Sequence, residues 1–302
     1  MDLKSKIILI YGPTASGKSH FAIKLAKKIN GEIINADSMQ IYKELKVLSA
    51  RPQKKDYNKI KHHLYAFQSV KKKFSTGDWL KLAKQKIKDI KKRNKIPIIV
   101  GGTGLYFKAL TDGLVNIPNI PMKFRENVRL LHKKIGARKF FLKLIKLDSL
   151  SQNYINPLDT QRAIRAYEVK SFTKKSIYEW FKITKSEFEE KDFFKIYIDY
   201  PRTELIKKIN LRTEEMVKNG AISEVRNFLK LKIPKSMTAS KAIGIEEIKG
   251  YINKKIQLSE VIEKISIKTR QYAKRQSTWG RGHMGNWKRT HSASLNKFLK
   301  KI

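Results

Sequence analysis

A glycine-bounded segment near the start of the chain carries side chains suited to binding phosphate. It consists of Gly12, Pro13, Thr14, Ala15, Ser16, Gly17, Lys18 and Ser19, which match the pattern G-x-x-x-x-G-K-[ST]. The glycines let the backbone approach an anion, and a helix beginning near Lys18 would direct its first N–H groups at that anion. Lys18 adds a positive charge, and the Ser19 hydroxyl suits a Mg²⁺ that bridges phosphate oxygens. We therefore predict a diphosphate or nucleotide site with Ser19 as metal ligand; the alternative is an accidental glycine turn beside a lysine.

A carboxylate follows the second short apolar segment of the chain. Residues 32–36 have the composition of a buried strand, and Asp37 comes directly after them. Ligands of open parallel sheets bind beyond the carboxyl ends of the strands, so we expect Asp37 at the same edge as the phosphate-binding segment. The alternative is that Asp37 only caps a following helix, because Asp-Ser before an apolar pattern also fits that role.

A third apolar segment, residues 97–100, is followed by Gly-Gly-Thr-Gly at 101–104. An ATPase with this kind of loop usually carries an aspartate after such a strand, where it helps to hold Mg²⁺ and to order water. Because no acid stands here, the sequence does not favour ATP hydrolysis. A helix beginning at Leu105 would direct further N–H groups to the same edge.

An arginine interrupts the apolar stripe of a helix predicted over residues 203–218, which Asn219 and Gly220 should end. The stripe consists of Leu205, Ile209 and Met216, and Arg212 stands where it should continue. A guanidinium on a buried stripe needs an anionic partner, since burying it unpaired costs several kcal/mol. That partner is either a structural carboxylate or a bound phosphate.

The elements that would position these groups predict an α/β fold. We expect a P-loop-type core, a parallel sheet flanked by helices, formed by residues 1–115 and 196–302. Between them, from about 116 to 195, the β/α alternation gives way to charged helical patterns, which indicates an inserted all-helical domain. A strand at 196–199 would return the chain to the sheet.

The composition points to a polyanionic partner. The 302 residues include 67 Lys and Arg against 26 Asp and Glu, a net charge of +41; nucleic acid is the first candidate, and a lysine-rich composition without such a partner is the alternative. The absence of cysteine excludes disulfides, thiolate zinc sites and a cysteine nucleophile. No segment resembles a signal peptide or a membrane span. We expect a cytoplasmic monomer with no membrane partner.

Two basic helical segments could contact nucleic acid. The first lies in the insert and contains Gln161, Arg162, Ala163, Ile164 and Arg165; the second, residues 269–276, contains Arg270, Lys274 and Arg275. Tyr272 and Trp279 are available for packing or for stacking on bases. The alternative for each arginine is a solvated helix face.

Taken together, these segments resemble the tRNA dimethylallyltransferases, also called tRNA isopentenyltransferases. The matching segments are residues 12–19, 37–42, 62–64, 100–106, 161–162, 165–166, 242–244, 269–276 and Trp279. They occur in the family's order and cover nearly the whole chain, which makes the resemblance specific.

The resemblance implies transfer of a dimethylallyl group from dimethylallyl diphosphate to N6 of the adenosine immediately 3′ of the tRNA anticodon, with Mg²⁺ as cofactor. The phosphate loop would then hold a diphosphate leaving group instead of ATP. By similarity, Asp37 would accept the proton of the amine, and Thr103 and Arg212 would complete the catalytic set.

By the same resemblance, the insert and the C-terminal basic helix would contact the tRNA anticodon stem-loop and hold the target base out of its stack. The predicted tRNA-contacting residues are Asp37, Ser38, Met39, Gln40, Thr103, Arg125, Gln161, Arg162, Ala163, Ile164, Arg165, Arg270, Lys274 and Arg275.

Three other functions remain open. A small-molecule kinase would need a similar loop and Mg²⁺, although a large basic insert disfavours it. An adenylate isopentenyltransferase would use a free nucleotide, whereas the charge of +41 favours RNA. An RNA-binding protein without catalysis would retain the loop only as a structural element.

Overall fold

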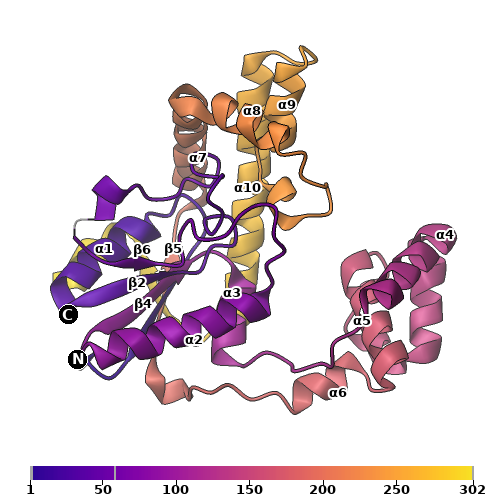
Figure 1. The fold of residues 1–302 in the computed structure, drawn as a ribbon. Coiled ribbons are helices and arrows are strands. Elements are labelled where there is room, and N and C mark those ends of the chain that lie inside the picture. The colour runs from indigo at the N-terminus through magenta and orange to yellow at the C-terminus, as the bar shows by residue number, and fades with distance from the viewer. Residues whose placement is uncertain (1–2, 58, 301–302) are drawn as a thin grey trace. The chain divides into compact units, whose positions relative to one another are not determined.

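The computed structural model describes residues 3–57 and 59–300, and their core is a parallel sheet with the strand order β3-β2-β4-β1-β5-β6 (Figure 1). The strands are β1 (Ile7–Tyr11), β2 (Gly31–Asn35), β3 (His62–His63), β4 (Ile96–Gly101), β5 (Phe193–Asp199) and β6 (Lys288–His291). Every pairing is parallel. The predicted α/β class, a parallel sheet flanked by helices, is confirmed.

Helices bury both faces of the sheet: α2 (Thr76–Lys92) and α3 (Gly104–Thr111) pack on one face, and α1 (Lys18–Ile29) and α11 (Leu295–Lys300) pack on the other. The same unit also contains α7 (Arg202–Met216), α8 (Ile222–Lys230), α9 (Ile245–Ile252) and α10 (Leu258–His283). Along β1, side chains alternate between a core shared with α2 and α3 and one shared with α1 and α11. A strand buried on both faces is continuously apolar, as β1 is.

Two helix boundaries have local causes. α2 begins at Thr76, because Ser75 and Asp78 form a capping box. α7 continues after Met216 into a short π-helix (Val217–Ala221), and the helical dihedral angles break at Asn219 and Gly220, where the sequence predicted the end; α8 follows. Gly220 has φ of 101° there, a conformation that favours glycine.

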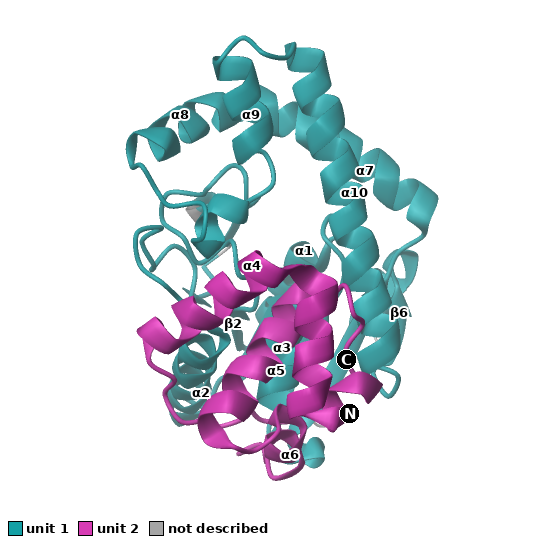
Figure 2. Cartoon of the chain, turned by 90° about the vertical axis from the view of Figure 1, so that its right-hand side faces the viewer, with its two compact units in different colours: residues 1–111, 188–302 teal, residues 112–187 magenta. Residues whose placement is uncertain are grey.

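A second compact unit, Asp112–Glu187, is all-helical (Figure 2). It contains α4 (Met122–Leu147), α5 (Thr160–Thr173) and α6 (Ile177–Lys182), packed around its own apolar core. Residues 188–192 belong to the first unit, and β5 begins at Phe193, whereas the sequence placed the return to the sheet at 196. No helix in the described parts of the chain has the length and apolar character that crossing a membrane requires.

A buried glutamate on β2, the strand that precedes Asp37, forms ion pairs with three basic side chains from neighbouring segments. Glu32 of β2 is fully buried, and its Oε2 atom lies 2.7 Å from both His63 Nε2 and Arg93 Nη2. Lys95 Nζ lies 3.4 Å from Oε1. Burial alone would raise the pKa of the Glu32 carboxyl, but the hydrogen bonds from Arg93 and His63 lower it to about 2. His63 therefore has a structural partner in this paired cluster.

We expect Glu32→Gln to lower the free energy of unfolding by about 3 kcal/mol, because it leaves a group of cations without their buried counter-charge. Denaturant unfolding at neutral pH measures the change, with Glu263→Gln on the exposed surface of α10 as control. Since the folded-state pKa of Glu32 is depressed, the wild type should lose this contribution as pH falls from about 4 towards 2, and the variant should not. Equal stability of the two proteins would contradict this role.

Candidate active site

The phosphate-binding segment follows β1 directly and has the expected shape. Ala15 and Gly17 have φ of 64° and 80°, and α1 begins at Lys18. The Lys18 ammonium donates a hydrogen bond to the Pro13 carbonyl oxygen at 3.2 Å. Burial lowers the pKa of Lys18 to about 8; nearby Asp37 opposes the shift, and Arg212 adds to it. Lys18 is thus a desolvated cation that lines a cavity together with the carboxylate of Asp37 and the guanidinium of Arg212.

Gln276 of α10 joins this loop to the loop that follows β4. Its Oε1 atom accepts a hydrogen bond from the Thr14 backbone N–H, and its Nε2 atom donates to the Gly102 carbonyl oxygen, both at 2.8 Å. The Tyr11 hydroxyl donates to the Gln276 backbone oxygen at 2.8 Å. Gln276 is 4% exposed. Gln276 lies within residues 269–276, which carry the family resemblance, but the resemblance assigns it no role. The sequence signal that could have identified it is a polar amide at a position that the helical pattern would bury.

Asp37 lies at the carboxyl end of β2, as predicted. Its Oδ1 atom accepts a hydrogen bond from the Met39 N–H at 2.9 Å, and its own N–H donates to Asn35 Oδ1 at 2.9 Å. Residues 38–53 contain no helix. The alternative that Asp37 caps a helix is therefore wrong: its side chain stabilises a tight turn, and Asp37 lines one cavity with Arg212 and a second with both Lys18 and Arg212.

The packing at the end of β4 explains why no aspartate stands there, where an ATPase with this kind of loop usually carries one. A Cβ atom at Gly101 would overlap with the backbone of Ala36, so only glycine fits where β4 passes β2. Thr103 then donates its N–H to the Ala36 carbonyl oxygen at 3.1 Å, and its Oγ1 atom accepts from the Ser38 N–H at 3.0 Å. Thr103 thus holds the segment that follows Asp37.

Arg212 contacts the phosphate-binding loop. Its Nη2 atom donates to Thr14 Oγ1 at 2.8 Å. Thr213, 3% exposed, continues the apolar stripe of α7 in place of Arg212. Burial lowers the pKa of Arg212, and Asp37 opposes that shift. Among the described residues no carboxylate lies within ion-pair distance of its guanidinium, which leaves it available to an anionic ligand.

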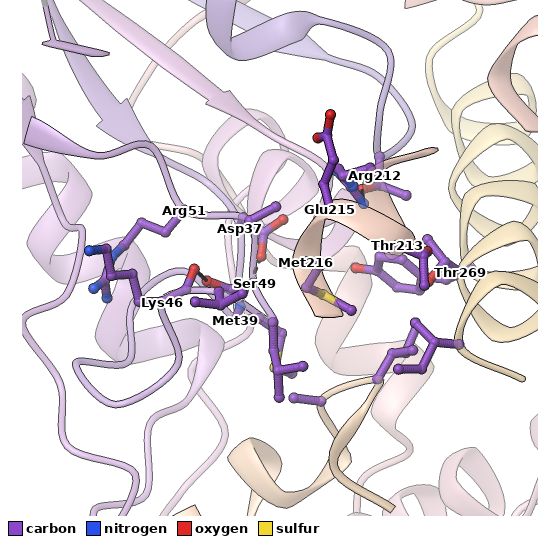
Figure 3. A pocket seen from close by; sticks show the side chains of 18 of the residues that line it. Asp37, Met39, Lys46, Ser49, Arg51, Arg212, Thr213, Glu215, Met216 and Thr269 are labelled. Carbon is purple, nitrogen blue, oxygen red and sulfur yellow. Dashed lines mark hydrogen bonds between the residues drawn. The ribbon is translucent and has the colours of Figure 1, made fainter. Parts of the chain in front are cut away.

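Two cavities meet at these residues. Figure 3 shows side chains that line the larger one, Asp37 and Arg212 among them. The larger, about 520 Å³, combines apolar side chains with charged ones; its lining includes Met39, Leu48, Met216, Ile243, Ile265, Tyr272 and Arg275. The smaller, about 380 Å³, borders Lys18, Ser19 and Gln40. Thr14, Asp37 and Arg212 line both. The arrangement can hold an anionic group at the loop and an apolar group beside it, with a carboxylate at their junction.

Ser19, the predicted metal ligand, is half-buried and lines the smaller cavity. A hydroxyl there suits a magnesium ion whose remaining ligands are phosphate oxygens and water. Within the described residues, no group of three or more His, Cys, Asp or Glu side chains could hold a metal ion by itself. His62 stacks on Tyr57 with ring centroids 3.8 Å apart, so the paired histidines serve packing and the Glu32 cluster.

The remaining predicted tRNA contacts divide between the two units. In the first, Arg275 lines the larger cavity, Lys274 is exposed and Arg270 is half-buried. The Gln40 amide donates to the Ser49 carbonyl oxygen at 3.1 Å. In the second, the predicted contacts on α4 and α5 are placed as follows: Gln161 and Arg162 exposed, Arg125 and Arg165 half-buried, Ile164 packed against the core, and Ala163 inside it. The Ala163 side chain therefore serves packing within that unit.

The fold and the site define an α/β protein in which Thr14 of the phosphate loop, Asp37 and Arg212 line the same two cavities, with no acid directly after β4. The family model for IPP transferase matches residues 40–283. The chain belongs to the IPP transferase family, which confirms the resemblance drawn from its motifs.

Curated relatives and solved structures agree with this assignment. A tRNA dimethylallyltransferase of Pelagibacter ubique is 59% identical over 302 residues, covering 100% of this chain and 96% of the relative. One from Rickettsia massiliae is 47% identical over 277 residues, covering 91% and 76%. The crystal structure of tRNA delta(2)-isopentenylpyrophosphate transferase from Staphylococcus epidermidis has a TM-score of 0.69 at 32% identity and covers 98% of this chain and 97% of its own. A eukaryotic dimethylallyltransferase acting on tRNA has a TM-score of 0.83 at 26% identity, covering 97% and 75%.

Proposed function

We propose that this chain transfers a dimethylallyl group from dimethylallyl diphosphate to N6 of the adenosine immediately 3′ of the anticodon in tRNA, with release of diphosphate. The printed names of its relatives support tRNA as substrate. The observation that carries the proposal is the junction of two cavities at Asp37, opposite the cations Lys18 and Arg212.

The phosphate loop would bind the leaving group. As the allylic C–O bond breaks, negative charge grows on the diphosphate, and preorganised donors stabilise that charge. Lys18, Arg212 and the N–H groups at the start of α1 are suited to this task. A Mg²⁺ held by the Ser19 hydroxyl would add Lewis-acid stabilisation of the phosphate oxygens.

Asp37 would act on the nucleophile. The exocyclic amine of adenine is weakly nucleophilic because its lone pair is delocalised into the ring. As N6 forms its bond to the allylic carbon, it must lose one proton, and a carboxylate within hydrogen-bond reach accepts it. Thr103, which holds the segment after Asp37, would keep the carboxylate in place.

The basic helices would position the RNA. The anticodon stem-loop would be contacted by Arg270, Lys274 and Arg275 of α10 and by the basic residues of an insert predicted over 116–195. The target base would leave its stack and bring its N6 to Asp37, where the two cavities meet. Phosphate contacts position an RNA without determining its sequence, so specificity would come from the loop and its bases. We place this reaction in the cytoplasm and propose a monomer.

The test is mass analysis of nucleosides from unmodified tRNA incubated with pure protein, Mg²⁺ and dimethylallyl diphosphate. Dimethylallyladenosine in the tRNA supports the proposal. Parallel incubations with AMP as acceptor and with ATP as donor address the adenylate isopentenyltransferase and the kinase. Turnover of ATP without prenylated tRNA, or prenylation of AMP alone, would overturn it.

We expect the affinity for dimethylallyl diphosphate to fall as pH rises through about 8, because the free enzyme's Lys18 loses its charge there. Below that pH the lysine is already protonated, whereas above it binding must take up a proton, which weakens binding by up to about tenfold per pH unit. Calorimetry at pH 7 and pH 9, in buffers of different ionisation enthalpy, measures the proton uptake. If binding at pH 9 took up no proton, the lowered pKa of Lys18 would be contradicted.

A further inference from the structure

One wall of the larger cavity is a segment without helix or strand. Residues 46–51 are consecutive in the sequence, and all six line the cavity. An irregular segment with no ladder of backbone hydrogen bonds needs other partners to keep one shape. The partners of its backbone therefore decide the shape of the site.

A single carboxylate binds the start of this wall. The N–H groups of Lys46 and Val47 donate to Glu224 Oε2, each at 2.7 Å, and the Leu48 N–H donates to Glu224 Oε1 at 3.0 Å. Three successive N–H groups form a concave site for an anion, and hydrogen bonds to a charged acceptor are about twice as strong as neutral ones. Glu224 comes from α8, far along the chain, and is half-buried.

The rest of the wall is held relative to this anchor. The Ser49 hydroxyl donates to the Leu45 carbonyl oxygen at 2.6 Å, and the Arg51 guanidinium donates to the Tyr42 carbonyl oxygen at 2.7 Å. The Leu48 side chain lies against Gly244, where a Cβ atom would approach it to 2.6 Å. These contacts close the segment on itself, but only the Glu224 carboxylate connects the N–H groups of residues 46–48 to α8.

We propose that Glu224 is a positioning residue for the transfer reaction: its carboxylate fixes residues 46–48 and thereby the width of the cavity that receives the prenyl group. This inference rests on the proposed function for its substrate. Glu224 touches neither the phosphate loop nor Asp37, so its effect would appear in substrate binding and in selectivity for prenyl size, with little change in the chemical step.

The variant Glu224→Gln tests this proposal. A glutamine keeps the size of the side chain but turns an –NH₂ group towards donors that need an acceptor. We expect KM for dimethylallyl diphosphate to rise about tenfold with kcat within about threefold of wild type, the pattern of lost substrate binding. The preference for dimethylallyl over geranyl diphosphate should fall about tenfold as the wall loosens. Glu246→Gln on the exposed surface of neighbouring α9 removes the same charge and should change neither.

Hydrogen exchange keeps the inference distinct from the proposed function. The amides of Lys46, Val47 and Leu48 should exchange at least about tenfold faster in Glu224→Gln than in wild type, a readout that needs no substrate. Glu224→Asp keeps the charge and serves if the glutamine variant folds poorly; its exchange and KM should lie between the two. A folded Glu224→Gln with wild-type exchange, KM and selectivity overturns the inference. A wild type that prenylates no tRNA instead overturns the proposed function.

Discussion

Replacing Asp37 with asparagine should reduce kcat for tRNA prenylation by about a thousandfold, which is within the range for loss of a general base. Asparagine retains an oxygen that can accept the hydrogen bond from the Met39 N–H, so the turn after β2 should keep its shape. An amide, however, cannot take the proton that the amine loses. Single-turnover rates with saturating tRNA and dimethylallyl diphosphate measure the effect.

The dissociation constant for tRNA is the second measurement on this variant, and it should stay within about threefold of wild type, since only one carboxylate has been neutralised. Asp89→Asn, on the surface of α2 where Asp89 pairs with Lys86, is the matched control and should leave both quantities unchanged. If Asp37→Asn transferred the prenyl group at the wild-type rate, Asp37 would not be the base. If Asp37→Asn lost tRNA prenylation while its tRNA affinity stayed intact, the alternative of an RNA-binding protein without catalysis would also be ruled out.

Lys18→Ala should lower kcat/KM for dimethylallyl diphosphate by about a thousandfold, at the upper end of the effect of removing one preorganised donor. Lys18 is part of the phosphate loop, and its ammonium is desolvated enough to lower its pKa to about 8, so its charge acts more strongly than it would in water. Most of the effect should appear in the transfer step, because negative charge on the diphosphate increases as the C–O bond breaks. Steady-state kinetics with tRNA held at saturation measures it.

Lys27→Ala, an exposed lysine of the same helix, removes an equal charge outside the loop and serves as control for Lys18→Ala. The tRNA dissociation constant should change little in either variant, because the chain retains many other cations. Unchanged kcat/KM in Lys18→Ala would show that the loop does not hold the leaving group. If Lys18→Ala lost tRNA binding while kcat/KM for dimethylallyl diphosphate stayed unchanged, Lys18 would contact the RNA instead of the diphosphate.

The first third of the fold could be predicted from the sequence because its signals are local. An apolar strand, a glycine-bounded loop and an amphipathic helix follow each other directly, and the parallel-sheet rule then places Asp37 at the same edge. The sequence predicts the start of β5 three residues too late, because Lys195 interrupts the apolar pattern of the strand. That lysine is largely buried, and its ammonium pairs with Glu190, a compensation that only the folded chain reveals.

Other parts of the site depend on residues that the sequence keeps far apart. Gln276 meets Thr14 across 262 positions, and Glu224 meets Val47 across 177. No periodicity encodes such pairs: Gln276 and Glu224 each stand in an ordinary helical pattern, and nothing near them in the sequence marks Thr14 or Val47 as the partner. Gly101 is a further case in which a distant residue decides the outcome. The sequence shows that no acid stands at the end of β4, and the fold gives the reason: the Ala36 backbone passes too close to residue 101 for any side chain.

The hydrogen bonds of Gln276 impose an order on how the protein matures during synthesis. The phosphate loop is synthesised before α10, and its Thr14 N–H finds its acceptor, Gln276, only after a further 262 positions have been synthesised. β6, which completes the sheet beside β5, is later still. A nascent chain therefore carries the phosphate-loop motif before it has the helix that supports this loop, and the loop reaches its final shape only together with α10.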